Sequence, residues 1–438
     1  MSYPAHLERT LAVAFLVGDL EVDGMVQRAA RLLGRRYRWL RGLAERVCAT
    51  YAGRRPRLAA LTEFIQSDSG YCRALERYDL EIEHFPPRDE MTPIAAAQSW
   101  KIPQLTTVGE LAAWLQLSVP ELEWFAHARG RAGEGRSERL QHYRYRPVHK
   151  RFGQVRLIEA PKERLKAIQW QLLIEMLQPI PLHAAAHGFR SGRSIQSFAS
   201  PHVGQQVVLK IDLQDFFPRI CAAQVSAIFR TIGYPEAVAD LLTGLCTNIT
   251  PWSTWNDLAT SISREERRRV EVLYGRPHLP QGAPTSPALA NLCAYPLDCR
   301  LAALADASGG RYTRYADDLA FSGGAEFARS IKRFHILACS IVLEEGFAIH
   351  HRKTRIMRPS VRQQLTGLVV NERLNIRRAD YDELKAILTN CVRHGPVSQN
   401  RAGHPDFRAH LLGCIAFVAQ IHPARGEKLR AIWRQIKW

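Results

Sequence analysis

The sequence predicts an α+β protein in which helices cover one face of a sheet of short strands. One observation predicts this class, and a second predicts that the chain folds. Short β-branched and aromatic runs alternate with segments of helical periodicity. Hydrophobic residues make up 46% of the 438 residues, which is enough for a sizeable core and excludes a disordered or low-complexity chain. At roughly 100–200 residues per unit, the length predicts two or three folding units.

The N-terminal 95 residues or so read as helical, because apolar residues recur at helical spacing from Leu40 to Val47 and from Leu58 to Phe64. Arginines accompany the aromatics Tyr37 and Trp39 in this block: Arg28, Arg31, Arg35, Arg36, Arg38 and Arg41. They indicate either a solvated helix face or a patch that follows a nucleic-acid backbone. The run Phe85-Pro86-Pro87 predicts a boundary.

The middle and C-terminal parts mix both element types. Residues 106–111 predict a helix start, 149–158 predict a basic hairpin with Gly153 in its turn, and 163–177 predict a helix. Strands are expected at 206–212, 311–315 and 319–322, and helices at 380–392 and 407–421.

The charge points to a polyanionic partner. The 60 Lys and Arg outnumber the 42 Asp and Glu, for a net charge of +18. A basic surface gains affinity for phosphates by releasing their counterions. Residues 351–438 hold 17 Lys and Arg against 6 Asp and Glu, so most of the excess lies near the C-terminus.

Cysteine usage and hydropathy predict a cytoplasmic protein without a membrane span. The nine cysteines are scattered, with no CxxC pair, and are expected to be reduced. No segment approaches the roughly 20 uncharged apolar residues of a membrane helix.

Three carboxylates stand where predicted strands end. Asp212 closes the strand at 206–212, and Asp317-Asp318 form the turn between two later strands. Adjacent acids in a tight turn repel each other unless a cation lies there. Mg²⁺ takes oxygen ligands and commonly uses one or two carboxylates plus substrate phosphates. An exposed turn is the alternative for the Asp-Asp pair alone.

Further motifs accompany these carboxylates in a fixed order. They are RLIEAPK at 156–162, AHGFRSGRSI at 186–195, DLQDFF at 212–217, LPQGAPTSP at 279–287, YADD at 315–318 and HRKT at 351–354. Together they resemble reverse transcriptases from about Thr106 to the C-terminus. The resemblance implies a right-hand polymerase, with fingers at 98–205, a palm with an antiparallel sheet at 206–370, a helical thumb at 371–438 and an N-terminal helical extension at 1–97.

The resemblance also assigns catalytic roles. Asp212, Asp317 and Asp318 would hold two Mg²⁺ ions for nucleotidyl transfer. Lys353 would lie near the leaving pyrophosphate, with a solvated charge as the alternative.

Other residues would bind the incoming deoxynucleoside triphosphate. Arg156 and Lys150 would grip its phosphates, although Lys150 matches the family position only approximately. Phe217 would lie under the sugar and exclude a 2′-hydroxyl, while Phe216 is expected in the core. Gln281 and Gly282 would bring backbone close to the nucleotide.

Within the family, the chain resembles bacterial retron enzymes most. Ala199 and His202 match an element usually written Asn-Ala-x-x-His, with Phe198 at the Asn position. Thr366 and Gly367 match a Val-Thr-Gly element, with Leu365 for the Val. His202, Thr366 and Gly367 are therefore expected to bind RNA.

The retron resemblance implies partners and a product. Such an enzyme would copy part of a structured noncoding RNA into DNA from a 2′-hydroxyl primer, giving a branched RNA–DNA hybrid, in antiphage defence. An effector protein would be a partner, and a host RNase H would remove template. A group II intron-like or other bacterial reverse transcriptase, and an RNA-binding scaffold that restrains an effector, are the alternatives.

Overall fold

A computed structural model describes residues 7–16, 20–51, 56–83, 90–127, 140–149, 155–258 and 262–438. The chain forms two compact units. The first contains residues 1–98, 104–122 and 230–241, and the second contains the rest. The expected boundary at residue 97 lies beside the break at 98, but 104–122 and 230–241 group with the N-terminal unit rather than with the expected fingers and palm.

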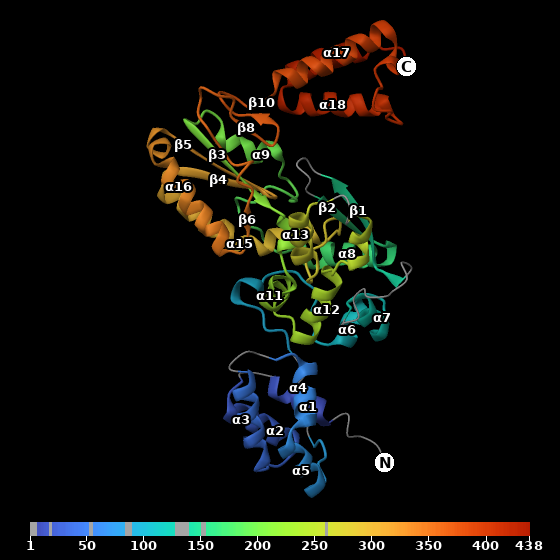
Figure 1. The fold of residues 1–438 in the computed structure, drawn as a ribbon, viewed down its shortest axis with the longest axis vertical. Coiled ribbons are helices and arrows are strands. Elements are labelled where there is room, and N and C mark those ends of the chain that lie inside the picture. The colour runs from blue at the N-terminus through green and yellow to red at the C-terminus, as the bar shows by residue number, and fades with distance from the viewer. Residues whose placement is uncertain are drawn as a thin grey trace. The chain divides into compact units, whose positions relative to one another are not determined.

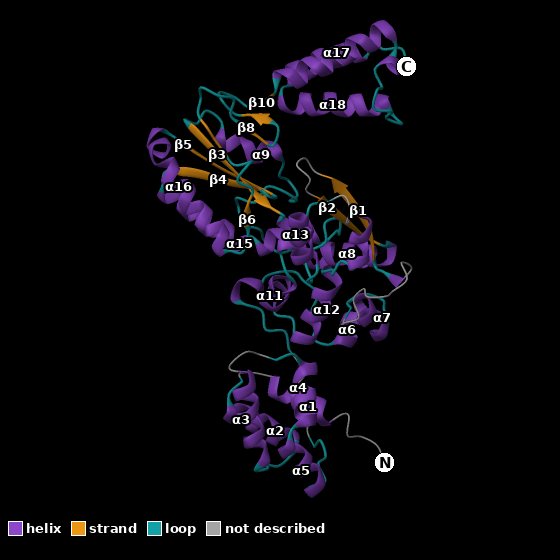
Figure 2. Cartoon of the chain, viewed as in Figure 1, coloured by secondary structure: helices purple, strands orange, loops and turns teal. Residues whose placement is uncertain are grey.

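The N-terminal unit is helical in its described residues (Figure 2). Its helices α1 to α5 are Leu7–Leu16, Val22–Leu32, Trp39–Tyr51, Leu58–Ser67 and Ser69–Arg77. They share one apolar core, which includes Leu11, Phe15, Met25 and Leu43. The Asp68 side chain caps α5 by accepting the Tyr71 N–H at 2.8 Å, and Arg46 holds that carboxylate at 2.6 and 2.9 Å.

Helix α6 (Val108–Trp114) begins where the sequence predicts, because Thr107 and Glu110 form a reciprocal capping box. Helix α7 is Val119–Phe125. Strands β1 (Tyr143–His149) and β2 (Val155–Pro161) confirm an antiparallel pair. The expected turn residue Gly153 lies outside the described residues. Helix α8 (Glu163–Gln171) continues as a π-helical stretch, Leu172–Leu177, so the expected helix at 163–177 is confirmed.

The central sheet has the strand order β4-β5-β3-β6, with β7 also paired to β3. Its strands are β3 (Val207–Gln214), β4 (Gly310–Tyr315), β5 (Asp318–Gly323), β6 (Ala348–Ile349) and β7 (Arg355–Met357). Every pairing among them is antiparallel. This confirms the three strands that the sequence predicts.

Both faces of this sheet are covered, so the expectation of helices on one face is wrong. Helices α15 (Tyr295–Ala307) and α16 (Ala325–Glu344) pack on one face (Figure 1). Helix α9 (Ile195–Ala199) and the C-terminal elements share a second core with Val208 and Ala320. Accordingly Val207, Val208 and Leu209 are buried consecutively in β3, without the alternation of a one-sided sheet.

The elements between the central strands are helical: α10 (Phe216–Arg219), α11 (Ala222–Ile232), α12 (Glu236–Cys246), α13 (Arg264–Tyr274) and α14 (Ser286–Cys293). Short 3₁₀ helices lie at Ala95–Ala97, Ser200–His202, Trp252–Leu258 and Pro396–Ser398.

The C-terminal elements begin with a three-stranded sheet of β8 (Gln364–Leu365), β9 (Leu368–Val369) and β10 (Asn375–Ile376). Helices α17 (Arg378–His394), α18 (Phe407–Ile421) and α19 (Pro423–Trp433) follow and confirm the two helices expected there. All nine cysteines are free thiols. Within the described part of the chain, no helix is long and apolar enough to cross a membrane.

Candidate active site

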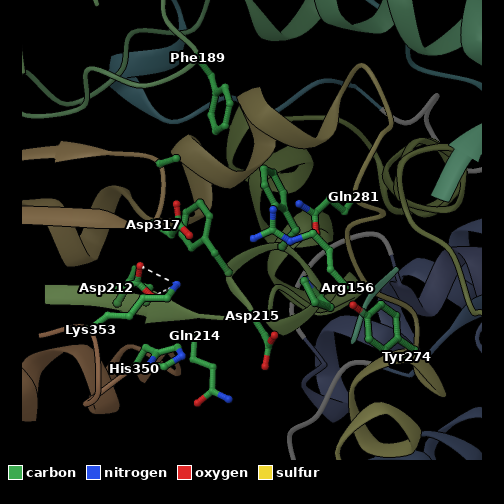
Figure 3. Close-up of a pocket in the computed structure, with 15 residues that line it drawn as sticks. Arg156, Phe189, Asp212, Gln214, Asp215, Tyr274, Gln281, Asp317, His350 and Lys353 are labelled. Atoms are coloured by element: carbon green, nitrogen blue, oxygen red, sulfur yellow. Dashed lines mark hydrogen bonds and ion pairs between the residues drawn. The ribbon is translucent and has the colours of Figure 1, made fainter. Parts of the chain in front are cut away.

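Strand pairing brings the predicted carboxylates to one end of the central sheet. Asp212 on β3 lies opposite Asp318 on β5. Asp317 lies in the two-residue turn from β4 to β5, where Ala316 takes a φ of 56°. Asp212 and Asp317 line one cavity of about 190 Å³ (Figure 3). Asp318 does not line that cavity.

Backbone hydrogen bonds fix the positions of these residues. The Leu213 N–H donates to the Asp317 carbonyl at 2.8 Å, which ties the turn to β3. The His350 N–H donates to the Asp212 carbonyl at 2.8 Å, which brings the segment before Lys353 to the same strand. The turn that carries Asp317 and the segment before Lys353 therefore both depend on β3 for their position.

Two lysines neutralise the carboxylates. The Lys353 ammonium donates to both oxygens of Asp212, at 3.0 and 3.1 Å. Lys210 forms an ion pair with Asp318 at 2.8 Å. The sequence analysis did not identify Lys210, although its place two residues before Asp212 puts both side chains on one face of β3.

Burial raises the pKa of Asp317, and the nearby charge of Asp212 raises it further, while Lys353 and Arg156 act in the opposite direction. Burial also raises the pKa of Asp318, against the effect of Lys210. Both pKa values are therefore raised mainly by burial, and a cation bound beside these carboxylates would stabilise their charged forms.

The donor set fits a hard divalent cation. Among the described residues, no group of three His, Cys, Asp or Glu side chains forms a metal site by itself. Mg²⁺ usually keeps several waters and takes one or two carboxylates, with substrate phosphates completing its shell. Asp212 and Asp317, on one cavity wall, supply carboxylates of that kind.

The opposite side of the cavity carries nucleotide-binding candidates. Arg156 on β2 and Gln281 face Asp212 and Asp317 across it (Figure 3). The Glu159 N–H donates to the Gln281 carbonyl at 2.9 Å, so β2 holds the Gln281 loop. Gly282 takes a φ of 135°, and a Cβ there would come within 3.0 Å of the Glu159 carbonyl. Glycine is therefore needed for both conformation and space.

Lys150, the second predicted phosphate ligand, lies outside the described residues.

A buried cluster around Glu159 supports β2. The Glu159 side chain is fully buried and accepts hydrogen bonds from Asn248 at 2.9 Å and from Thr250 at 2.8 Å, while its other oxygen lies 2.9 Å from His278 Nε2. None of these three partners was singled out from the sequence.

Phe217 lines the cavity and is half-buried. Its ring centroid lies 5.6 Å from that of Phe216 and 5.9 Å from that of Phe189. Phe216 is buried and stacks on Phe347 at 5.6 Å, which confirms its expected place in the core. Phe189 is a cavity-lining residue that the sequence analysis missed; it is 48% exposed and has a φ of 58°.

A buried arginine supports the catalytic turn from behind. Arg314 is fully buried and pairs with both oxygens of Asp298, at 2.7 and 2.6 Å. It also donates to the Asn291 side chain at 2.9 Å and to the Ala316 carbonyl at 3.3 Å.

Gly188 completes this support. Asn291 donates to the Gly188 carbonyl at 2.9 Å, and a Cβ on Gly188 would lie 2.6 Å from the Ala316 nitrogen. The glycine of the AHGFRSGRSI motif thus lets one loop pack directly on the turn that carries Asp317.

The His202 side chain, expected as part of an RNA-binding element, faces the interior. His202 is fully buried, and its ring nitrogens lie 2.6 Å from Ser322 Oγ and 2.7 Å from Thr313 Oγ1. Burial, with Arg311 and His187 nearby, lowers its pKa to about 3. Phe198 is also fully buried and lies 5.8 Å from Tyr315 between ring centroids. This element packs behind the catalytic hairpin.

Thr366 and Gly367 form the turn between β8 and β9, and their φ values are 43° and 89°. Gly367 is exposed and lines a groove beside α17 and α18, whereas Thr366 is half-buried. A positive φ is unusual for a β-branched residue such as threonine.

Comparison with known proteins agrees with this arrangement. The family model for reverse transcriptase (RNA-dependent DNA polymerase) matches residues 148–377, just over half of the chain. Retron Mx65 reverse transcriptase of Myxococcus xanthus is 39% identical over 349 residues, covering 78% of this chain and 74% of that protein. Retron Mx162 reverse transcriptase of the same organism is 34% identical, covering 75% and 66% respectively.

Retron Ec86 reverse transcriptase of Escherichia coli is 34% identical over 290 residues, which cover 66% of this chain and 79% of that protein. The matched region contains all three carboxylates, Lys353 and the loop of Gln281. It corresponds to a right-hand polymerase fold with an antiparallel palm sheet. The chain belongs to the retron-type reverse transcriptases, which are RNA-directed DNA polymerases.

Proposed function

We propose that this enzyme copies part of a cognate structured noncoding RNA into DNA at the cavity between Asp212 and Arg156. The observation that carries the proposal is the pairing of two carboxylates on one wall with a guanidinium and an amide on the other. The cavity, at about 190 Å³, is smaller than the roughly 300–1,000 Å³ of ordinary ligand pockets. The small volume is consistent with a site whose remaining walls are formed by the bound template and primer.

Each side chain has a distinct task in nucleotidyl transfer. Asp212 and Asp317, with Asp318, would hold two Mg²⁺ ions, and such ions would supply a lower pKa for the primer hydroxyl and positive charge beside the phosphates. The primer hydroxyl gives its proton to water and its oxygen bonds to the α-phosphorus. The bond from that phosphorus to the oxygen bridging the α- and β-phosphates breaks, and pyrophosphate leaves. Arg156 and Lys150 orient the triphosphate, and Gln281 and Gly282 line its base and sugar side.

Lys353 acts on the leaving group. In the present geometry its ammonium neutralises Asp212. With a cation bound to Asp212, this ammonium would be available to the pyrophosphate, whose charge it would balance or which it would protonate. Phe217 selects deoxynucleotides, because a ring under the sugar leaves no room for a 2′-hydroxyl.

Around this site we propose fingers at 98–205, a palm at 206–370 and a thumb at 371–438. Thr366 and Gly367 form a turn that meets the RNA, and the basic excess of residues 351–438 is shared between the end of the palm and the thumb. By analogy with retrons, the product is a branched RNA–DNA hybrid primed from a 2′-hydroxyl. A cytoplasmic role in antiphage defence, an effector protein and a host RNase H complete the proposal.

The test separates catalysis from RNA binding. The Asp317→Asn, Asp318→Asn double variant should retain the copurifying RNA but lose its DNA. Asp306→Asn is the matched control, because Asp306 is exposed on α15. Nucleic acid should be extracted from each protein and sequenced after treatment with RNase, DNase or a debranching enzyme.

One defined RNA joined to DNA through a 2′-linkage supports the retron product. Unbranched DNA on one RNA would instead indicate another type of bacterial reverse transcriptase. A wild-type protein that carries RNA but makes no DNA on any primed template would indicate a scaffold.

A further inference from the structure

A partly buried arginine on α13 contacts a residue of the cavity wall and has no role in the mechanism above. Arg269 donates to both oxygens of Glu266, at 2.7 and 2.5 Å, and also to Asp215. The three side chains are nearly enclosed, with exposed fractions of 17% for Arg269, 8% for Glu266 and 6% for Asp215. This Arg269 cluster unites residues that are 54 positions apart in the chain.

The cluster holds the first residue of β2 by both of its backbone groups. Glu266 accepts the Val155 N–H at 2.8 Å, and Arg269 donates to the Val155 carbonyl at 3.1 Å. The next residue is Arg156, the predicted triphosphate ligand. The position of that guanidinium therefore depends on Arg269 and Glu266.

The cluster also holds a second segment that lines the cavity. Asp215 lines the cavity, has a φ of 54° and immediately precedes α10, which carries Phe217. A left-handed conformation at a residue other than glycine costs energy and persists where contacts enforce it. The Arg269 ion pair is such a contact, so the placement of Phe217 depends on it.

Charge gives a second reason for the cluster. Asp215 is a nearly enclosed carboxylate on the wall of a cavity that must admit a triphosphate. Left without its guanidinium, it would repel the phosphates. The fork of Arg269 satisfies two carboxylates and a carbonyl together, which the single ammonium of a lysine cannot do.

We propose that Arg269 is a positioning residue that sets both nucleotide affinity and sugar selection, through Arg156 on one side and Phe217 on the other. The inference rests on the proposed function of the cavity. It assigns no contact between Arg269 and the nucleotide.

The experiment compares Arg269→Lys with Arg268→Lys. Arg268 is the adjacent residue on α13 and is exposed. Its substitution by lysine removes a guanidinium in the same way but leaves the cluster unchanged. Each protein is bound to a primed RNA template whose primer ends in a dideoxynucleotide, so that no bond forms. The Kd of the next complementary deoxynucleotide, and of the matching ribonucleotide, is then measured with Mg²⁺.

We expect Arg269→Lys to raise the Kd of the deoxynucleotide about tenfold and to reduce the preference over the ribonucleotide by a similar factor. Arg268→Lys should leave both values within about twofold. Thermal melting of both variants reports the folded fraction. Equal Kd values for the two variants, or a loss of affinity that only follows a loss of folded protein, would overturn the inference.

Because binding is measured without chemistry, the result is independent of the proposed catalysis. Failure of the wild-type protein to extend an ordinary primer would count against the proposed function. The ratio of Kd values between the two variants would still decide the role of Arg269.

Discussion

Arg314 and Arg269 belong to two ionic clusters that each contact a residue lining the cavity, and they differ in what they hold. Arg314 is fully buried, balances one carboxylate, Asp298, and contacts the backbone of the catalytic turn. Arg269 is partly exposed, balances two carboxylates, and contacts the base of β2. The first cluster should therefore matter mainly for folding, and the second mainly for the shape of the cavity.

Replacing Arg314 should have the largest effect on stability. Arg314→Met leaves Asp298 as an uncompensated buried charge, which typically costs about 3–5 kcal/mol. The urea midpoint should fall sharply, whereas Arg329→Met, on the exposed surface of α16, should leave it unchanged. Adding Asp298→Leu to Arg314→Met should restore part of the loss. A wild-type midpoint for Arg314→Met would remove the difference between the clusters.

Replacing Phe217 should act on selectivity without comparable loss of stability. Phe217→Ala opens the space beneath the sugar, and incorporation of ribonucleotides relative to deoxynucleotides should rise by at least about tenfold, or about 1.4 kcal/mol. Phe217→Tyr keeps the ring and should keep the discrimination. Primer extension with each nucleotide type measures both. Unchanged discrimination in Phe217→Ala would refute the assignment of this residue as the sugar gate.

His202 predicts a pH dependence of stability, because its buried ring must stay neutral in the folded protein. Because its folded pKa is about 3 and an unfolded histidine titrates near about 6.5, the unfolded chain takes up the proton first as the pH falls. Its contribution to stability is therefore complete above about pH 6.5 and decreases below it, by up to about 1.4 kcal/mol per pH unit.

Urea midpoints between pH 7 and pH 5 measure this decrease. His202→Gln should show a shallower dependence than the wild type, whereas His394→Gln, at an exposed position, should not differ from it. Parallel pH profiles for His202→Gln and the wild type would show that the buried ring does not titrate as described.

The smallest effect is expected in the N-terminal unit, where Arg41 pairs with Asp23 and Glu45 at 3.3 Å on the surface. All three side chains are more than half exposed, so solvent screens the interaction. Arg41→Gln should change stability by less than about 1 kcal/mol. A larger change would mean that exposure is a poor guide to the value of an ion pair in this protein.

Local patterns were sufficient to predict the hairpin that carries Asp317 and Asp318. Strands with a tight turn between them place Asp317 and Asp318 at one sheet end, and antiparallel pairing sets Asp318 against Asp212. The roles of Arg156, Gln281 and Phe217 came from matched motifs, and the structure places all three around one cavity. Their functions stay predictions until measured.

The supporting clusters could not be predicted, because their partners are far apart in the sequence. Asp215 and Arg269 are separated by 54 residues, and Glu159 and His278 by 119. Nothing local distinguishes Arg269 from Arg267 or Arg268 beside it. His202 shows another limit of the sequence, since a motif identified the residue but did not reveal that its side chain faces the interior.

The most direct test of the central claim is DNA synthesis on a primed RNA template by the Asp212→Asn variant. Asp212 lines the cavity and binds Lys353. The asparagine amide has nearly the same shape as the carboxylate but lacks the negative charge that would hold a cation. Single-turnover extension with Mg²⁺ should fall by at least about a thousandfold relative to the wild type, with an unchanged melting temperature. Extension at the wild-type rate would contradict the assignment of this cavity as the polymerase site.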